Sequence, residues 1–278
     1  MVVGSGSGHS GAMTQTSVSA DVIAQAAERL RSAAAAGVPV APVRDLIGST
    51  DIAAAYAVQN ANIAAAVAAG RTVVGRKIGL TSKAVQQQIG VDTPDFGWLL
   101  DDMAYPDGAT IPAATVLQPK VEGEIAFVLG KDLADGDLDP EQIRDAIDHA
   151  VAAIEVCGSR VADWDITFGD TVADNASSGV YVLGSTPLSL RDFDPVAVEM
   201  SMVVDGVEVS SGNGAACLGD PLNAVAWLAR YARDFGEPLR AGQVLLSGAL
   251  GPMYAVSPGN EVVVSLSTLG TVSAHFSN

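Results

Sequence analysis

Two glutamates separated by a single residue are the most informative chemical feature of this sequence. Glu122 and Glu124 flank Gly123 and stand directly before the apolar run at 125–129. Side chains two residues apart on a β-strand share one face, so both carboxylates are expected to point the same way. Two such carboxylates repel each other unless a cation lies between them, and their oxygens suit Mg²⁺ or Mn²⁺. The alternative interpretation of Glu-x-Glu is the exposed edge of a β-ribbon.

A third acid strengthens the metal hypothesis. Glu155 lies within 151–157, a run too apolar to form a solvated surface. A carboxylate in such a strand needs a partner, because an isolated buried charge is very costly. That partner can be a base such as Arg160, in which case Glu155 forms a salt bridge. It can instead be a cation that Glu155 shares with Glu122 and Glu124, and the three glutamates then form a facial metal site.

A lysine and an aspartate follow other strand-like segments. Lys77 alternates with the apolar Ile78, so its side chain can face a pocket, although a lone lysine is usually a solvated surface group. The glycines at 75 and 79 allow the backbone to approach a ligand closely. The stretch 93–97 has the composition of an ordinary turn, in which Asp95 is most simply a turn former.

The composition limits the possible partners. Lys+Arg is 15 against Asp+Glu 32, a net charge of −17, which repels phosphate backbones and makes nucleic acid an unexpected partner. A small anionic substrate therefore needs local cations or a bound metal. The two cysteines, Cys157 and Cys217, are predicted to be buried, reduced thiols of a cytoplasmic protein. The mean hydropathy is +0.30, but no apolar run is long enough to span a membrane.

The chain divides into a leader and one domain. Residues 1–13 have the composition of a leader or a disordered tail, and 14–278 is predicted to be a single domain with a helical layer at 14–70 and a β-rich core at 71–278. The hexapeptide at 6–11 satisfies Gly-x-Gly-x-x-Gly, but no strand precedes it and no helix follows at once. A dinucleotide site is therefore rejected.

The elements that position these residues predict an α+β fold, with a helical N-terminal layer on a mostly β core. Helices are expected at 19–37, 51–70, 139–152 and 220–235, with caps at Ser19, Asp139 and Asp220. Strands are expected at 72–80, 116–129, 153–156, 179–183, 196–204, 207–210, 243–247, 261–266 and 271–276. Asp205-Gly206 between two strands predicts a hairpin. Strands and helices do not alternate regularly, which argues against a doubly wound parallel sheet.

The order of these stretches resembles the 2-keto-4-pentenoate hydratase family of the fumarylacetoacetate hydrolase-like superfamily. The matching motifs are Gly-Arg-Lys-Ile-Gly-Leu-Thr-Ser (75–82), Thr-Pro-Asp-Phe-Gly (93–97), Gln-Pro-Lys-Val-Glu-Gly-Glu-Ile-Ala-Phe (118–127), Ala-Ile-Glu-Val-Cys (153–157) and Asp-Asn-Ala-Ser-Ser (174–178). The resemblance continues through 214–225 and 247–253, so it covers nearly everything after the leader. It implies a mixed β-roll or barrel like the C-terminal domain of fumarylacetoacetase.

The resemblance also implies roles for individual residues. Glu122, Glu124 and Glu155 would bind Mg²⁺ or Mn²⁺, Lys77 would hold or polarise the substrate, and Asp95 would take part in proton transfer. Ser177 and Ser247 would bind substrate, with a simpler role in turns and packing as the alternative.

The implied activity is a metal-dependent hydratase of aromatic or sterol meta-cleavage catabolism. It would add water to 2-hydroxypenta-2,4-dienoate, or a close homologue, to give a 4-hydroxy-2-ketoacid. The expected protein is a cytoplasmic homo-oligomer, pentameric or decameric, with a downstream aldolase or a sister decarboxylase as a possible partner.

Two other functions stay open. One is a 4-oxalocrotonate-type decarboxylase, which must recognise a second carboxylate, with Arg76, Lys83 or Arg160 as the cation to examine first. The uncharged stretch 248–253 favours the hydratase. The other is a non-catalytic partner subunit, which would have no need of Lys77, Asp95 and the three glutamates together.

Overall fold

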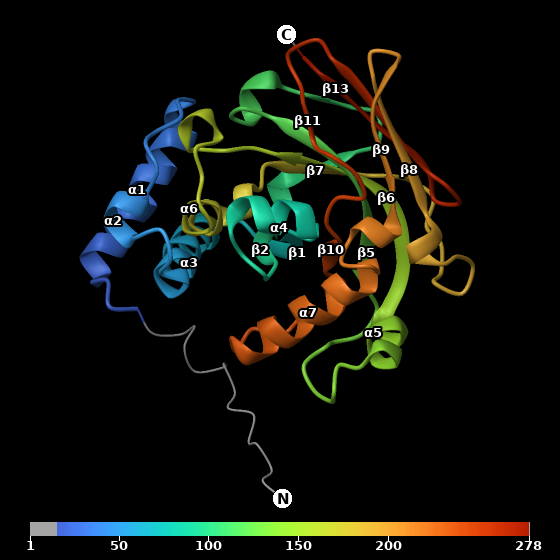
Figure 1. Ribbon diagram of the computed structural model, residues 1–278, viewed down its shortest axis with the longest axis horizontal. Helices are drawn as coiled ribbons and strands as arrows, with labels where there is room; N and C mark the ends of the chain where they lie inside the picture. Colours follow the sequence, from blue (N-terminus) through green and yellow to red (C-terminus); the bar gives the residue numbers. More distant parts are fainter. Residues whose placement is uncertain (1–15, 278) are drawn as a thin grey trace, which may run out of the picture.

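The computed structural model describes residues 16–277 (Figure 1). The predicted leader at 1–13 and its glycine-rich hexapeptide at 6–11 lie outside the described residues, so both statements stay predictions. Helices at the N-terminal end cover one side of a curved β core, as Figure 1 shows. The predicted α+β fold class is confirmed.

The helical layer forms where the sequence predicts it. Its members are α1 (Ala20–Ala36), α2 (Arg44–Ile47), α3 (Ile52–Ala68) and, from later in the chain, α6 (Phe168–Ala173). The Ser19 side chain caps α1 by accepting from the backbone N–H of Val22, and Gly37 ends the helix at a φ of 67°. One face of α1 is buried and packs against α3, which in turn contacts α6. The helices at 19–37 and 51–70 are thereby confirmed.

The larger sheet holds the strands that carry most of the candidate residues. Its order is β2 (Asp95–Leu100), β1 (Val73–Gly79), β10 (Val244–Leu246), β5 (Lys120–Leu129), β6 (Ile147–Cys157), β7 (Val180–Leu183) and β3 (Ala104–Pro106), and β11 (Tyr254–Ala255) pairs with β5. The pairs β1–β10 and β3–β7 are parallel, and the others are antiparallel. The sheet is therefore mixed, with the long β5–β6 pair at its centre.

A smaller sheet lies behind this centre. Its order is β4 (Ala109–Ile111), β13 (Gly270–Phe276), β12 (Glu261–Leu266), β8 (Glu199–Val204) and β9 (Val207–Asn213). The hairpin predicted at Asp205-Gly206 joins β8 to β9 with φ values of 50° and 80°, so it is confirmed. On the back of β5, a Cβ at Gly123 would meet Val264 at 2.9 Å and Met200 at 3.0 Å. Because neighbouring strand residues face opposite sides, this close packing turns Glu122 and Glu124 away from the smaller sheet.

Three further helices are α4 (Lys83–Ile89), α5 (Pro140–Ala146) and α7 (Pro221–Asp234). Asp139 and Asp220 cap α5 and α7, each with proline in the first helical turn, as predicted. Helix α7 covers the face of β1 from which Arg76 projects. The Arg76 guanidinium lies 4.0 Å from the ring centroid of Trp98, inside an aromatic cluster that includes Phe96 and Tyr231. Arg76 and Lys77 thus occupy opposite faces of the strand.

Two local predictions are wrong. The helix expected through Ala152 ends at Ala146, and 147–157 forms β6 instead. Alanine favours helix, but pairing with β5 along nearly its whole length overrides that local preference. The stretch 93–97 is not simply a turn, because Asp95 begins the fully buried strand β2, which pairs with β1.

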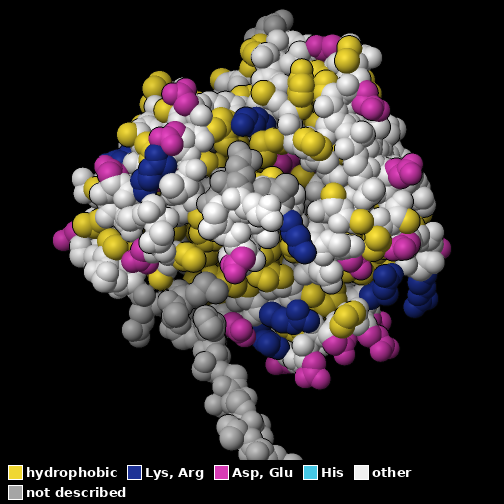
Figure 2. Space-filling view, viewed as in Figure 1, with side chains coloured by type: hydrophobic (Ala, Val, Ile, Leu, Met, Phe, Trp, Pro, Cys, Tyr) yellow, Lys and Arg dark blue, Asp and Glu magenta, His cyan; other side chains and the backbone are white. Residues whose placement is uncertain are grey.

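Acidic and basic side chains are intermingled on the face seen in Figure 2. Acidic side chains are scattered over the face seen in Figure 2, and the basic ones stand apart or beside acids without forming a stripe. Within residues 16–277, no helix has both the length and the apolar character that crossing a bilayer requires.

The β1–β10 contact generates a stability prediction. A Cβ at Gly75 would lie 1.9 Å from the Val244 carbonyl oxygen, so Gly75→Ala must separate two parallel strands. We expect the free energy of unfolding to fall by about 2–4 kcal/mol in urea denaturation. Gly184→Ala is the matched control, since its methyl would meet nothing closer than 3.2 Å. Equal stability of the two variants would contradict the packing described for β1.

Candidate active site

The site begins at the central strand pair. Glu122 on β5 lies directly opposite Glu155 on β6, so two carboxylates face each other across neighbouring strands. Lys77 on β1 reaches the same point, and its Nζ lies 3.2 Å from Glu155 Oε1. The side chains of Lys77 and Glu155 are 5% and 2% exposed, so this ion pair is shielded from solvent. Arg160, the alternative partner for Glu155, instead binds Asp174.

Glu124 lies on the same face of β5 and is completely buried. Its Oε2 accepts a hydrogen bond of 2.8 Å from the backbone N–H of Gly248, in the turn after β10. Its Oε1 has no hydrogen-bond partner, and neither oxygen of Glu155 has one, because the Lys77 contact is an ion pair without hydrogen-bond alignment. The exposed-edge alternative for Glu-x-Glu is therefore wrong: the pair points into the protein.

Asp95 joins the cluster because β2 pairs with β1. It lies opposite Gly79, where a Cβ would come within 2.2 Å of Asp95 Oδ1 and 3.3 Å of Lys77 Nζ. A glycine is therefore required to leave room for the carboxylate beside the ammonium group. Burial raises the pKa of Asp95 to about 6, with Lys77 lowering it and Glu155 raising it. A carboxyl group with this pKa can accept or donate a proton near neutral pH.

Burial and neighbouring charges also shift the pKa values of the other ionisable groups in the cluster. Burial raises the pKa of Glu122 to about 7, and the charge of Glu155 adds to the effect. Burial and the charges of Glu155 and Glu122 raise the pKa of Glu124 well above its ordinary value. Burial alone would lower the pKa of Lys77, but Glu155 and the other acids outweigh it and raise that pKa well above its ordinary value. Lys77 therefore stays charged and only partly compensates the acids.

A cavity of about 520 Å³ opens onto this cluster. Its polar end is lined by Lys77, Asp95, Glu122 and Ser177. Its other walls include the apolar side chains of Leu80, Val85, Ile166, Ala249 and Met253, of which Val85 and Met253 are 37% and 41% exposed. The cavity thus has a charged floor and an apolar upper part that reaches the surface.

Ser177 reaches the cavity through strained backbone. Asn175, Ala176 and Ser177 have φ values of 56°, 51° and 55°, which cost non-glycine residues roughly 1–2 kcal/mol each. The Asn175 side chain holds the segment by accepting from the N–H of Trp98 at 2.8 Å and donating to its carbonyl at 3.0 Å. The Ser177 hydroxyl lies 3.1 Å from that of Thr171. Strain held this firmly is typical of a segment that must present a side chain to a ligand.

Ser247 occupies a different position. It is completely buried, receives a 3.3 Å hydrogen bond from the N–H of Ile125 and donates one of 3.1 Å to the Gly248 carbonyl. It is absent from the cavity lining, whereas Ala249 two residues later is part of it. Its contacts support the turn that brings Gly248 to Glu124, and its role in substrate binding stays a prediction.

Several cavity-lining residues were not singled out from the sequence as parts of the site, among them Lys120, Cys157, Trp164 and Thr171. Lys120 and Cys157 lie two residues from Glu122 and Glu155, so strand alternation alone could have indicated them. The Lys120 ammonium lies 4.2 Å from the ring centroid of Trp164. Neither Trp164 nor Thr171 carried a local signal, because each reaches the cavity through a short helical segment that the sequence did not predict.

A larger hollow of about 850 Å³ lies beside α5, but its lining has no buried polar group without a partner. Two of its basic side chains are already bound: Lys131 pairs with Asp145 at 2.6 Å, and Arg144 donates to the Leu190 carbonyl at 3.1 Å. The smaller cavity is therefore the candidate active site.

Comparison with known proteins identifies relatives of this chain. The family model described as fumarylacetoacetate (FAA) hydrolase, C-terminal, matches residues 62–277. A curated "TodF product hydratase" of Pseudomonas putida is 56% identical over 254 residues, which cover 91% of this chain and 95% of the relative. A 2-keto-4-pentenoate hydratase of Paraburkholderia xenovorans is 54% identical over 252 residues, covering 91% and 94%. The chain belongs to the 2-keto-4-pentenoate hydratase family.

A solved structure of a relative has the same fold. The 4-oxalocrotonate decarboxylase from Pseudomonas putida G7, complexed with magnesium and adipate, matches with a TM-score of 0.90 and 32% identity over 94% of this chain and 100% of that one. The predicted family and the fumarylacetoacetase-like fold are confirmed.

The donor set fits a divalent cation. Among the described residues, Glu124 Oε1 and both Glu155 oxygens are buried without hydrogen-bond partners, next to a single ammonium group. Unpartnered buried carboxylate oxygens cost free energy unless a cation binds them. Carboxylate oxygens without a nitrogen donor are the ligands that Mg²⁺ and Mn²⁺ prefer. Glu122, Glu124 and Glu155 of this family member are therefore suited to hold such an ion.

The raised pKa of Glu122 predicts an unusual pH dependence for chelator-stripped protein. The folded state binds this proton more tightly than the unfolded chain, so the free energy of unfolding falls as pH rises from about 4.5 through about 7. We expect Glu122→Gln to be more stable than the wild type at pH 8 but not at pH 4.5, and Mg²⁺ to stabilise only the wild type strongly. Thermal unfolding with and without Mg²⁺ measures both effects. Exposed Glu261→Gln is the control, and a wild type insensitive to both pH and Mg²⁺ would contradict this assignment.

Proposed function

We propose that this chain is a divalent-metal-dependent hydratase that adds water to 2-hydroxypenta-2,4-dienoate or a close homologue. The observation that carries the proposal is a group of four buried acids beside one lysine, with carboxylate oxygens left unpartnered; Lys77, Asp95 and Glu122 of this group line the floor of the cavity. Relatives at 54% and 56% identity, over nearly their whole length, bear the names of hydratases. A non-catalytic partner subunit is disfavoured, because nothing in a scaffold offsets the cost of burying these charges.

Glu122, Glu124 and Glu155 are the proposed metal ligands, and Mg²⁺ or Mn²⁺ the proposed ion. Such an ion supplies Lewis-acid stabilisation of negative charge on the substrate's 2-oxygen. Lys77, held by Glu155, adds a second positive charge beside the same floor of the cavity. Ser177, fixed by its strained segment, offers a hydroxyl for orienting the bound acid.

Asp95 is the proposed proton carrier. In the first step the 2-hydroxyl proton is lost and C5 gains a proton, which converts the dienol to the conjugated 2-keto-3-enoate. Water then adds at C4, a proton is delivered to C3, and the product is 4-hydroxy-2-oxopentanoate. Asp95 suits these transfers because its pKa lies near 6 and its Oδ1 has no competing hydrogen-bond partner.

The same floor can also serve the decarboxylase alternative, and one observation favours testing it. A diacid substrate needs a second cation, and Lys120 lines the cavity two residues from Glu122 on the same strand face. The cations considered first are unsuited: Arg76 faces the aromatic cluster, Arg160 binds Asp174, and Lys83 is exposed on α4. The apolar upper walls nonetheless match the uncharged tail of a monoacid, so the hydratase remains the preferred function.

The setting follows from the proposed activity. We propose a cytoplasmic homo-oligomer built on pentameric rings, acting in the meta-cleavage breakdown of aromatic or sterol rings. Its product, a 4-hydroxy-2-ketoacid, is a substrate for an aldolase, which makes a downstream aldolase or the sister decarboxylase the proposed protein partner.

A product assay distinguishes the two activities. With Mg²⁺ and 2-hydroxypenta-2,4-dienoate, the enzyme should consume the dienol absorbance and form 4-hydroxy-2-oxopentanoate, because the cavity offers an apolar wall to the tail. With 4-oxalocrotonate it should release little CO₂. If decarboxylation is faster than hydration, the hydratase assignment is rejected, while the assignment of the metal ligands is unaffected. In that case Lys120→Met is expected to abolish the decarboxylation.

Two conservative variants separate proton transfer from metal binding. Asp95→Asn should lower kcat by about 10²–10⁴ while Mg²⁺ binding persists, since it removes the proton carrier without removing a ligand. Glu124→Gln should lose both activity and stoichiometric Mg²⁺ binding while circular dichroism shows a folded protein. Turnover and calorimetric Mg²⁺ titration measure the two properties. Full activity of Asp95→Asn would exclude the role given to Asp95.

A further inference from the structure

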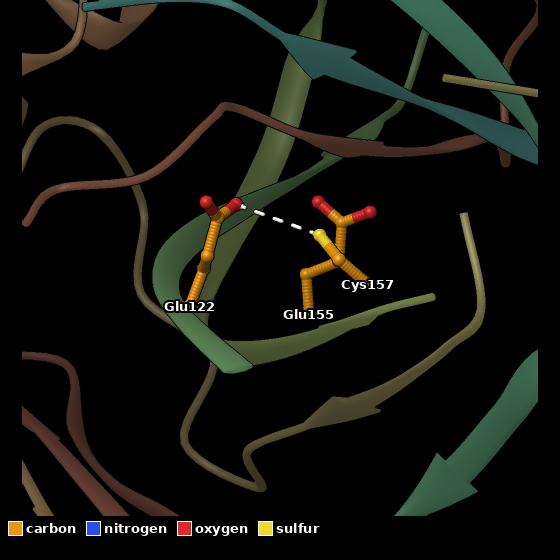
Figure 3. A group of neighbouring side chains, drawn as sticks. All are labelled: Glu122, Glu155 and Cys157. Carbon is orange, nitrogen blue, oxygen red and sulfur yellow. Dashed lines mark hydrogen bonds between the residues drawn. The ribbon is translucent and has the colours of Figure 1, made fainter. Parts of the chain in front are cut away.

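A thiol lies at the edge of the carboxylate cluster. Cys157 stands two residues after Glu155 on β6, so both side chains occupy one face of the strand. Its side chain is buried, and its Sγ lies 3.8 Å from Glu122 Oε2 as a weak donor. Figure 3 shows the carboxyl groups of Glu122 and Glu155 and the Cys157 thiol gathered in one place. One ligand atom of each residue lies within 4.8 Å of those of the other two.

The distance between the thiol and carboxylate atoms is close to that between two ligands of a tetrahedrally coordinated cation. Zinc binds sulfur at about 2.3 Å and carboxylate oxygen at about 2.1 Å, so two such ligands at a tetrahedral angle lie about 3.6 Å apart. The observed sulfur–oxygen distance is 3.8 Å. A thiol and a carboxylate can therefore bind one ion here with only small side-chain rotations.

Glu155 independently indicates a missing ligand. It is 1% exposed, and neither of its oxygens has a hydrogen-bond partner. Lys77 pairs with Oε1, which leaves Oε2 available. An unpartnered carboxylate oxygen beside a thiol is therefore open to a cation from the sulfur side of the cluster.

The two possible ligand sets differ in chemical softness. Glu122, Glu124 and Glu155 offer only oxygen, which suits Mg²⁺ and Mn²⁺. A second set has Cys157 as its third ligand in place of Glu124. It offers two carboxylates and a thiolate, which suit softer ions such as Zn²⁺ and Cd²⁺. Glu122 and Glu155 belong to both sets, so the two kinds of ion exclude each other.

We propose that Cys157 gives the active site a second ligand set, Glu122–Glu155–Cys157, which captures a thiophilic divalent cation in place of Mg²⁺. The proposal rests on the carboxylate metal site of the proposed function. On capture, the S–H bond breaks, a metal–sulfur bond forms and the proton passes to the buffer, with no change of oxidation state. Such an ion excludes Mg²⁺ and binds away from Glu124, so it inhibits the hydratase.

Cys217 provides a matched control. It is the other free cysteine and is also completely buried. Its Sγ donates to the Ser247 carbonyl oxygen at 3.0 Å, and it belongs to no such metal-binding group among the described residues. Both cysteines can be replaced by serine, which keeps size and a hydroxyl donor.

The test titrates chelator-stripped full-length protein with Cd²⁺ and, separately, with Mg²⁺. Wild type and Cys217→Ser should bind one Cd²⁺ per chain and develop an ultraviolet sulfur-to-cadmium charge-transfer band. Cys157→Ser should lack the band and bind Cd²⁺ with affinity lower by on the order of tenfold or more. Its Mg²⁺ affinity should change far less, because the oxygen set is intact.

The outcomes separate this proposal from the proposed function. A band that persists in Cys157→Ser, or Cd²⁺ binding to wild type without a band, overturns the thiol site. Cadmium NMR of wild type gives the same decision without any variant, since a resonance typical of oxygen ligands alone overturns it. If the band forms but Mg²⁺ does not bind wild type, the thiol site stands and the carboxylate site of the hydratase fails.

Discussion

The structure depends on negative charge buried where strands β5 and β6 pair. Glu122, Glu124 and Glu155 lie in the protein interior with Asp95 close by, and Lys77 is the ammonium that reaches them. Burying unpaired charge costs several kcal/mol per group, so the arrangement is stable only if the acids take up protons or share a cation. The raised pKa values of Glu122 and Asp95 describe the first outcome, and a bound divalent ion is the second.

The surrounding fold keeps these groups together rather than letting them separate. The β5–β6 register sets Glu122 opposite Glu155, and the packing of Gly123 against Val264 fixes which face of β5 carries the acids. On the far side of the cavity, the strained segment at 175–177 is held by side-chain hydrogen bonds to Trp98. Rigid supports of this kind cost folding free energy, which is typical of sites that must be preformed for binding or catalysis.

Local patterns in the sequence predicted what depends on near neighbours. The helix caps at Ser19 and Asp139 and the hairpin at Asp205-Gly206 are confirmed, since each is set by a few adjacent residues. Alternation along a strand likewise placed Glu122 and Glu124 on one face. Predictions were wrong where a distant strand decided the outcome: the alanines before Ala153 became part of β6 through pairing with β5, and Asp95 became part of β2 through pairing with β1.

The candidate site shows the same contrast between features set by neighbouring residues and contacts between distant parts of the chain. The sequence indicated which acids share a strand face, but it could not show that Lys77 meets Glu155, or that Trp164 covers Lys120, because these contacts join remote parts of the chain. The family resemblance supplied the missing connection between strands. Of the residues it selected, Lys77, Asp95, Glu122 and Ser177 line one cavity, Glu124 and Glu155 are buried beside them, and Ser247 contacts the backbone of Ile125 outside the lining.

Anomalous diffraction from crystals grown with Mn²⁺ tests the central claim most directly. The account predicts one strong peak per chain, bound by carboxylate oxygens of Glu122, Glu124 and Glu155 at roughly 2.0–2.3 Å. It also predicts that the peak disappears in Glu124→Gln. A wild-type crystal with no manganese at these carboxylates, or with manganese bound only elsewhere on the chain, would contradict it.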